Sequence, residues 1–193
     1  IPNTVVTIGD YAFYYCTSLT EIEIPNTVVT IGDYAFYDCT GLENLIFEEN
    51  SQLVSIRGYT FAGCTSLKTV IFEDDSQLDT IANQAFYNCN LTTIDFGDNS
   101  QLRYIGVSAF SYCSNLRTIE FPSTITHIGA SAFRECGLTQ LYIPSSVTTI
   151  ESDAFALNDI DFTFGERFDI SLSTIDDYAF QDLLAGSYNS NFF

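Results

Sequence analysis

The chain has 193 residues, of which 46% are hydrophobic and 16% are charged. It is too apolar to be disordered, and no apolar run approaches the roughly 18 residues that a membrane-spanning helix needs. Six Lys and Arg against 25 Asp and Glu give a net charge of −19. A field of that sign repels phosphate backbones and anionic membranes, which argues against nucleic acid as a partner and against membrane insertion of this segment. Because the sequence contains no Met, we expect it to be a processed or excised piece of a longer protein.

One repeated unit runs along the whole chain. Its first copy reads Ile8-x-x-x-Ala12-Phe13-x-x-Cys16-x-x-Leu19-x-x-Ile22-x-Ile24, and copies follow about every 22 to 25 residues, inside the range of leucine-rich repeats. Each copy starts with an apolar residue three positions before its first Ile. These starting residues are Val5, Val28, Leu53, Leu78, Leu102, Ile125, Val147 and Leu172. The sequence therefore predicts a single solenoid of about eight coils over residues 1–193, in which each coil packs against its neighbours.

Within each copy, three elements follow in order. A Gly directly after the first Ile, as at Gly9, indicates a bend. The Ala-Phe-x-x-Cys piece is too short for an isolated helix and is expected to form one helical or 3-10 turn, with the Phe in the core. The Leu-x-x-Ile-x-Ile piece alternates like a short strand. Stacked copies predict an α/β-type repeat architecture, with a parallel β-sheet on one face and short helical turns on the other. The inward strand positions are Ile22/Ile24, Leu45/Phe47, Val70/Phe72, Ile94/Phe96, Ile119/Phe121 and Leu141/Ile143.

Copies 2 to 4 carry lengthened loops after the strand, at 48–52, 73–77 and 97–101. Their acidic residues form a predicted acidic ledge along one edge: Glu48, Glu49, Glu73, Asp74, Asp75 and Asp98. Such a ledge could hold calcium weakly, could steer a basic protein, or could be a solvated charge run. The seventh copy replaces the Cys by Asn158, and we expect it to lose register, with its strand slipped within 160–164.

The six cysteines occupy one repeat position: Cys16, Cys39, Cys64, Cys89, Cys113 and Cys136. Stacked equivalents would approach with parallel side-chain directions, which suits a disulfide dihedral poorly. We expect buried free thiols that behave as small hydrophobic side chains. No Cys-x-x-Cys pair is present, so no zinc site is expected.

The sequence offers little for catalysis. His127 is the single histidine and stands where other copies have Thr, Ser or Tyr, which indicates a tolerant surface position. There is no Gly-x-Ser-x-Gly elbow and no phosphate-binding loop. We therefore expect no enzymatic activity, no cofactor and no resident metal, although a pair of carboxylates of the glycosidase kind is not formally excluded.

The outward positions of the predicted strands form the first candidate binding surface. Its candidate ligand-binding residues are Glu21, Glu23, Ile46, Ile71, Asp95, Glu120 and Tyr142. A solvated sheet needs no outward aliphatic residue, so Ile46 beside Ile71 indicates a binding surface. The alternative is that β-branched residues simply suit strands. A further row of tyrosines brackets the repeat Phe and includes Tyr11, Tyr34 and Tyr59. We expect it to cover the core, or to contact another copy or domain.

The unit Val-x-x-Ile-Gly-x-x-Ala-Phe-x-x-Cys-x-x-Leu-x-x-Ile-x-Ile-Pro resembles the Treponema pallidum-type, or BspA-like, leucine-rich repeat. The resemblance implies a cell-surface or secreted protein that adheres to host, matrix or cell-surface molecules. Our first hypothesis is a non-catalytic module that presents the strand face to a protein or glycan ligand. The second is a structural spacer with no ligand of its own. The oligomeric state is left open, and we expect the natural array to extend further on the N-terminal side.

Overall fold

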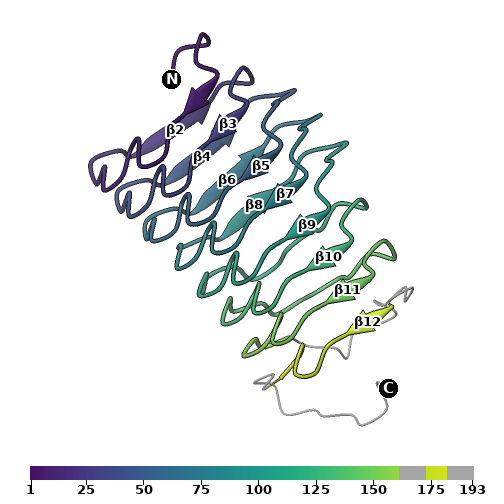
Figure 1. Ribbon diagram of the computed structural model, residues 1–193. Coiled ribbons are helices and arrows are strands. Elements are labelled where there is room, and N and C mark those ends of the chain that lie inside the picture. The colour runs from purple at the N-terminus through teal and green to yellow at the C-terminus, as the bar shows by residue number, and fades with distance from the viewer. Residues whose placement is uncertain (161–172, 182–193) are drawn as a thin grey trace.

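The computed structural model describes residues 1–160 and 173–181, over which the chain winds into a stack of similar coils (Figure 1). The coils follow one another from the N-terminus to the C-terminus, so neighbours in sequence are neighbours in space. Eight strands of one parallel sheet mark about seven complete turns. The predicted leucine-rich-repeat solenoid is therefore confirmed. Within the described residues, no helix is long and apolar enough to cross a membrane.

Two parallel sheets form the two long walls of the stack, where the sequence predicted one. The four-stranded sheet comes from the predicted Leu-x-x-Ile-x-Ile strands. Its members are β2 (Glu21–Ile24), β4 (Asn44–Phe47), β6 (Thr69–Phe72) and β8 (Thr93–Asp95). Every second residue in these strands is buried, which confirms the predicted alternation. In coils 5 and 6, Ile119, Phe121, Leu141 and Ile143 are buried as predicted, but they lie outside the strands of this sheet.

The eight-stranded sheet forms at the start of each repeat, where the sequence analysis expected only the approach to a bend. Its strands are β1 (Thr7–Ile8), β3 (Thr30–Ile31), β5 (Ser55–Ile56), β7 (Thr80–Ile81), β9 (Tyr104–Ile105), β10 (His127–Ile128), β11 (Thr149–Ile150) and β12 (Thr174–Ile175). Each strand has two residues, and the second, always Ile, points into the core. The β-branched Thr-Ile pair suits a pleated surface, which explains why pairing begins here.

The predicted helical turn is wrong. We call residues 9–16 and their equivalents the turn segment; the described residues contain no helix there or elsewhere. Positive φ recurs two positions before each repeat Phe and two positions after each one from Phe13 to Phe155, as at Tyr11 and Tyr15, both at 57°. A right-handed helix requires negative φ at every residue. Two left-handed residues four positions apart therefore break the helix and leave consecutive tight turns.

Hydrogen bonds in the turn segment alternate in direction. The amide of Ala12 donates to Gly9 of its own coil at 3.3 Å. The amides of Tyr11, Phe13 and Tyr15 donate to the carbonyls of the next coil, at 3.1, 2.7 and 2.9 Å. Later coils repeat this pattern, so the segment both closes its own turns and stacks on its neighbour.

A ladder of phenylalanines fills the core, as predicted. The repeat Phe of each coil stacks on the next with ring centroids 4.8 to 5.4 Å apart and ring planes within 9° of parallel. The rings from Phe36 to Phe155 are fully buried. One continuous apolar column therefore joins all the coils, and stability depends on contacts between neighbouring coils.

Candidate functional site

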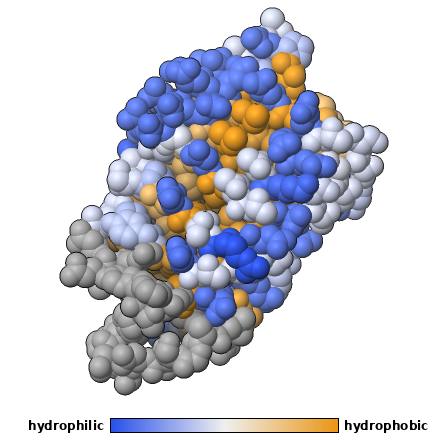
Figure 2. All heavy atoms as spheres, turned by 180° about the vertical axis from the view of Figure 1, so that it is seen from behind, coloured by the Kyte–Doolittle hydropathy of each residue, from blue (hydrophilic) through white to orange (hydrophobic). Residues whose placement is uncertain are grey.

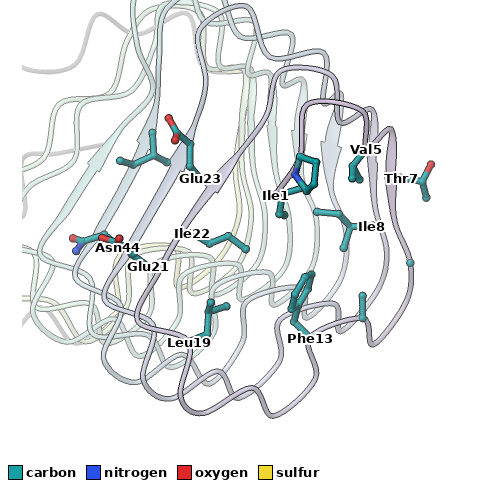
Figure 3. A pocket seen from close by; sticks show the side chains of 14 residues that line it. Ile1, Val5, Thr7, Ile8, Phe13, Leu19, Glu21, Ile22, Glu23 and Asn44 are labelled. Atoms are coloured by element: carbon teal, nitrogen blue, oxygen red, sulfur yellow. The ribbon is translucent and has the colours of Figure 1, made fainter.

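The outward residues of the four-stranded sheet lie in register, and we call this surface the strand face. Strand pairing places Glu23 beside Ile46, Ile46 beside Ile71, and Ile71 beside Asp95. A parallel row, Glu21, Asn44, Thr69 and Thr93, runs beside the first. Side chains that alternate along β2 leave Ile22 inside the coil while Glu23 points away from it (Figure 3).

The strand face presents two half-exposed isoleucines between two exposed carboxylates. Ile46 and Ile71 are partly buried, whereas Glu23 and Asp95 are exposed. Adjacent strands in a sheet lie about 4.8 Å apart, so the two isoleucines contact each other and form a small apolar strip. Such a strip, bounded by carboxylates, can pack an apolar side chain and accept hydrogen bonds from donors beside it.

Two predicted ligand-binding residues lie beyond the paired strands. Glu120 is exposed in coil 5, and Tyr142 is 49% exposed in coil 6. Strand pairing therefore brings together Glu21, Glu23, Ile46, Ile71 and Asp95, but it does not extend to these two. The Lys68 ammonium lies 2.9 Å from a Glu43 carboxylate oxygen next to the strands, with both side chains about half exposed.

A hollow of about 780 Å³ opens at the N-terminal end of the stack. Figure 3 shows Ile8, Phe13, Leu19 and Ile22 pointing toward one another inside the first coil. Phe13 and Leu19 are only partly buried, because the first coil has a neighbour on one side only. The hollow is the exposed end of the core, and the adjoining part of the strand face contributes Glu23 and Ile46 to its rim.

Carboxylates of the acidic ledge bind the backbone of neighbouring coils. Glu48 accepts a hydrogen bond from the Asn26 amide at 3.1 Å, and Asp74 accepts one from the Asp98 amide at 2.8 Å. A third bond, from the Asn99 side chain to Asp75, measures 3.0 Å. Part of the ledge is therefore structural. In the portion of the chain that the structure describes, no group of three or more His, Cys, Asp or Glu side chains is placed to hold a metal ion.

The cysteines form the predicted ladder of free thiols, and all but Cys16 are buried. Each buried thiol donates a hydrogen bond to the Phe carbonyl of the preceding coil, as Cys89 does to Phe61 at 3.2 Å. Asn158 makes the equivalent bond to Phe133 at 2.7 Å and is fully buried. The seventh coil thus keeps its register through Asn158, contrary to the sequence analysis. The slipped strand expected within 160–164 falls almost entirely outside the described residues.

His127 is not an isolated surface residue. Its ring stacks on Tyr104 of the preceding coil at 4.7 Å, and its Nε2 lies 2.8 Å from a carboxylate oxygen of Glu151 in the next coil. The other oxygen of Glu151 accepts the Ala130 amide at 2.8 Å. The repeat pattern did not predict this group, although Tyr104 and His127 share one repeat position and Glu151 stands two positions further along the next coil. It ties coils 5, 6 and 7 together on the eight-stranded sheet.

Exposed apolar residues also lie on the eight-stranded side, which the sequence analysis did not single out. Val6, Val29 and Val54 occupy one repeat position, directly before the outward Thr or Ser, and are 54%, 42% and 54% exposed. Figure 2 shows one face on which hydrophobic residues form a band between more hydrophilic margins. The repeat position alone would have indicated this valine row.

Comparisons with solved structures find bacterial leucine-rich repeat proteins. One, from Eubacterium ventriosum, is 33% identical with a TM-score of 0.65 over 70% of this chain and 35% of that one. The T. pallidum leucine-rich repeat protein is 28% identical with a TM-score of 0.67, over 78% of this chain and 69% of that one. The pneumococcal vaccine antigen PcpA, at 19% identity and a TM-score of 0.52 over 91% of this chain and 51% of that one, shares the fold.

This chain thus spans about a third of the length of the Eubacterium ventriosum protein. No curated protein matches the sequence. The family model described as "BspA type Leucine rich repeat region (6 copies)" matches residues 1–101, 49–161 and 80–187, which together include almost every coil. The chain therefore belongs to the family of BspA-type leucine-rich repeat proteins.

Proposed function

We propose that the chain is a non-catalytic binding module of a cell-surface or secreted adhesion protein, and that its strand face binds a protein or glycan ligand. One observation carries the proposal: the register that places Ile46 beside Ile71 on the solvent side of the sheet, between Glu23 and Asp95. A sheet surface that faces only water does not require aliphatic side chains in such a strip. Stacked repeats commonly use an extended face of this kind for binding.

Substitution of the strip tests the proposal. Ile46→Thr and Ile71→Thr keep the β-branch, and so keep the strand preference, but remove apolar contact area. We expect the double variant to lose about tenfold or more in affinity for immobilised matrix proteins or whole cells, measured by surface binding. The matched control, Val29→Thr with Val54→Thr, makes the same kind of change on the other sheet and should bind as the parent does.

If the strip variant binds as tightly as the control, the strand face is not the binding surface. Failure of the parent chain to bind any matrix protein, glycan or cell surface would favour the structural spacer, in which the repeats separate other parts of a longer protein. The thermal unfolding midpoints of both variants should match the parent, so a folding defect is distinguished from a binding defect.

A further inference from the structure

Six tyrosines form one contacting group on the turn segments of coils 1 to 3, and we call this group the tyrosine patch. Its members are Tyr11, Tyr14, Tyr15, Tyr34, Tyr37 and Tyr59. Tyr11, Tyr34 and Tyr59 stack in a column with centroid distances of 5.2 and 4.8 Å. The ring of Tyr14 crosses those of Tyr11 and Tyr15 at 72°, so the patch presents ring faces as well as ring edges.

The patch is exposed in the first coil, while Tyr34, Tyr37 and Tyr59 are partly buried. Tyr11, Tyr14 and Tyr15 are 55%, 42% and 54% exposed, whereas the stacked Phe36 and Phe61 beneath the same coils are fully buried. The left-handed backbone at Tyr11, Tyr15, Tyr34 and Tyr59 accompanies this outward placement. Of the two alternatives left open for the tyrosine row, contact with a partner fits this exposure better than cover for the core.

Two carboxylates, Asp33 and Asp38, stand next to patch tyrosines in the second coil. The carboxylate of Asp38 raises the pKa of Tyr15, and burial, neighbouring tyrosines and the charge of Asp33 raise the pKa of Tyr34. The first Lys or Arg in the sequence is Arg57, so coils 1 and 2 contain no cationic side chain. None of the ion pairs among the described residues involves Asp33 or Asp38.

We propose that the tyrosine patch, together with Asp33 and Asp38, is a second binding site that takes arginine or lysine side chains of a basic protein segment. Guanidinium and ammonium groups bind the faces of aromatic rings and are attracted by adjacent carboxylates. This site goes beyond the proposed function of the strand face and does not depend on it. A second copy of the chain is a poor occupant, because it would bring another net charge of −19 and an equally acidic patch.

The other repeats supply substitutions that the fold accepts. Gln84 stands at the position of Tyr11, Ala62 at that of Tyr14 and Asn88 at that of Tyr15, and Gln84 and Asn88 share the positive φ of the residues they would replace. The triple variant Tyr11→Gln, Tyr14→Ala, Tyr15→Asn therefore removes the exposed rings and preserves both charge and backbone. The matched control, Tyr87→Ala with Tyr112→Asn, removes two contacting tyrosines of coils 4 and 5.

The experiment measures binding of fluorescent octa-arginine to the full chain by anisotropy, in enough salt to screen weak surface contacts. We expect the triple variant to lose about tenfold in affinity and the control to change less than about twofold. Asp33→Asn with Asp38→Asn should weaken binding more than Glu49→Gln with Glu73→Gln, which removes the same charge from the acidic ledge. The strand-face variant Ile46→Thr, Ile71→Thr should bind octa-arginine as the parent does.

Equal losses in the patch and control variants would show unspecific attraction to an acidic protein and overturn the proposal. An unchanged affinity in the folded triple variant would do the same. Binding of neutral cellohexaose that the triple variant alone abolishes, without any effect on octa-arginine, would instead make the patch a glycan site. Sedimentation would make the patch a self-association surface if it showed dimers of the parent chain and only monomers of the triple variant.

Discussion

At the scale of single residues, the cysteine position shows what the fold requires there. Five stacked thiols and Asn158 each donate to a Phe carbonyl of the coil before, and all six are buried. A buried carbonyl left without a donor costs about 1–3 kcal/mol. The position therefore selects a small side chain with a hydrogen-bond donor, a property that Cys and Asn share despite their different hydropathy.

Thiol chemistry checks this interpretation. Burial raises the pKa of Cys89 and Cys113, so these thiols stay protonated and unreactive near neutral pH. We expect only Cys16, which is half-exposed, to react rapidly with a disulfide reagent in the folded chain, and the other five to react once urea unfolds it. Cys16→Ser should abolish the rapid phase. Rapid labelling of several thiols in folded Cys16→Ser would contradict the buried ladder.

At the scale of elements, strand and core could be predicted, while the turn segment could not. Four of the six predicted strands are confirmed, because alternation with a period of two is direct evidence of a half-buried strand. The turn segment contains only a few residues between Gly9 and Cys16. Over so short a stretch, the spacing of apolar residues does not distinguish a helical turn from left-handed turns. The sequence did carry a signal: Val, Ile and Thr never occupy the positive-φ positions of the described coils.

Part of the candidate surface was also within reach of the sequence. Because extra residues enter only the loops, the register of Glu23, Ile46, Ile71 and Asp95 followed from the repeat itself. The exposure of the tyrosines did not follow, since it depends on the left-handed turns that the sequence analysis took for helix. The contact of His127 with Glu151 joins different coils, and hydrophobic period gives no information about such polar contacts.

A substitution at Ser108 tests the turn segment. Ser108 has a φ of 53°, where a β-branched side chain clashes with its own backbone. We expect Ser108→Val to destabilise the fold by about 1–2 kcal/mol in urea unfolding, and Ser108→Gly to change it by less than about 1 kcal/mol. Ser114→Val, at an exposed position without positive φ, should have little effect. Equal effects at both serines would contradict the left-handed turn.

At the scale of the whole molecule, the phenylalanine ladder makes the coils interdependent. Phe86 is fully buried between Phe61 and Phe110, at 5.3 and 5.2 Å, whereas Phe13 stacks on one neighbour and is only partly buried. Removing a central ring opens a cavity inside the column and weakens the contacts with both neighbouring coils. The free energy of unfolding of the entire array should therefore decrease.

We therefore expect Phe86→Ala to destabilise the chain by about 3–5 kcal/mol and Phe13→Ala by clearly less. Urea unfolding followed by far-ultraviolet circular dichroism measures both. If the central coils fold as one unit, Phe86→Ala shifts a single transition. If Phe13→Ala lost as much stability as Phe86→Ala, stacking within the phenylalanine ladder would not be the main interaction that holds the coils together.

Backbone hydrogen bonds between coils run in both directions along the stack. In the turn segment, the amides at the positions of Tyr11, Phe13 and Tyr15 donate to the following coil, whereas the amides at positions equivalent to Gly9 and those of the eight-stranded sheet donate to the preceding coil. Peptide dipoles of opposite direction largely cancel, as they do within a sheet. An open edge of the stack therefore presents backbone acceptors along one segment and backbone donors along the other. A coil added there can pair with that edge only where its own donors and acceptors match both segments.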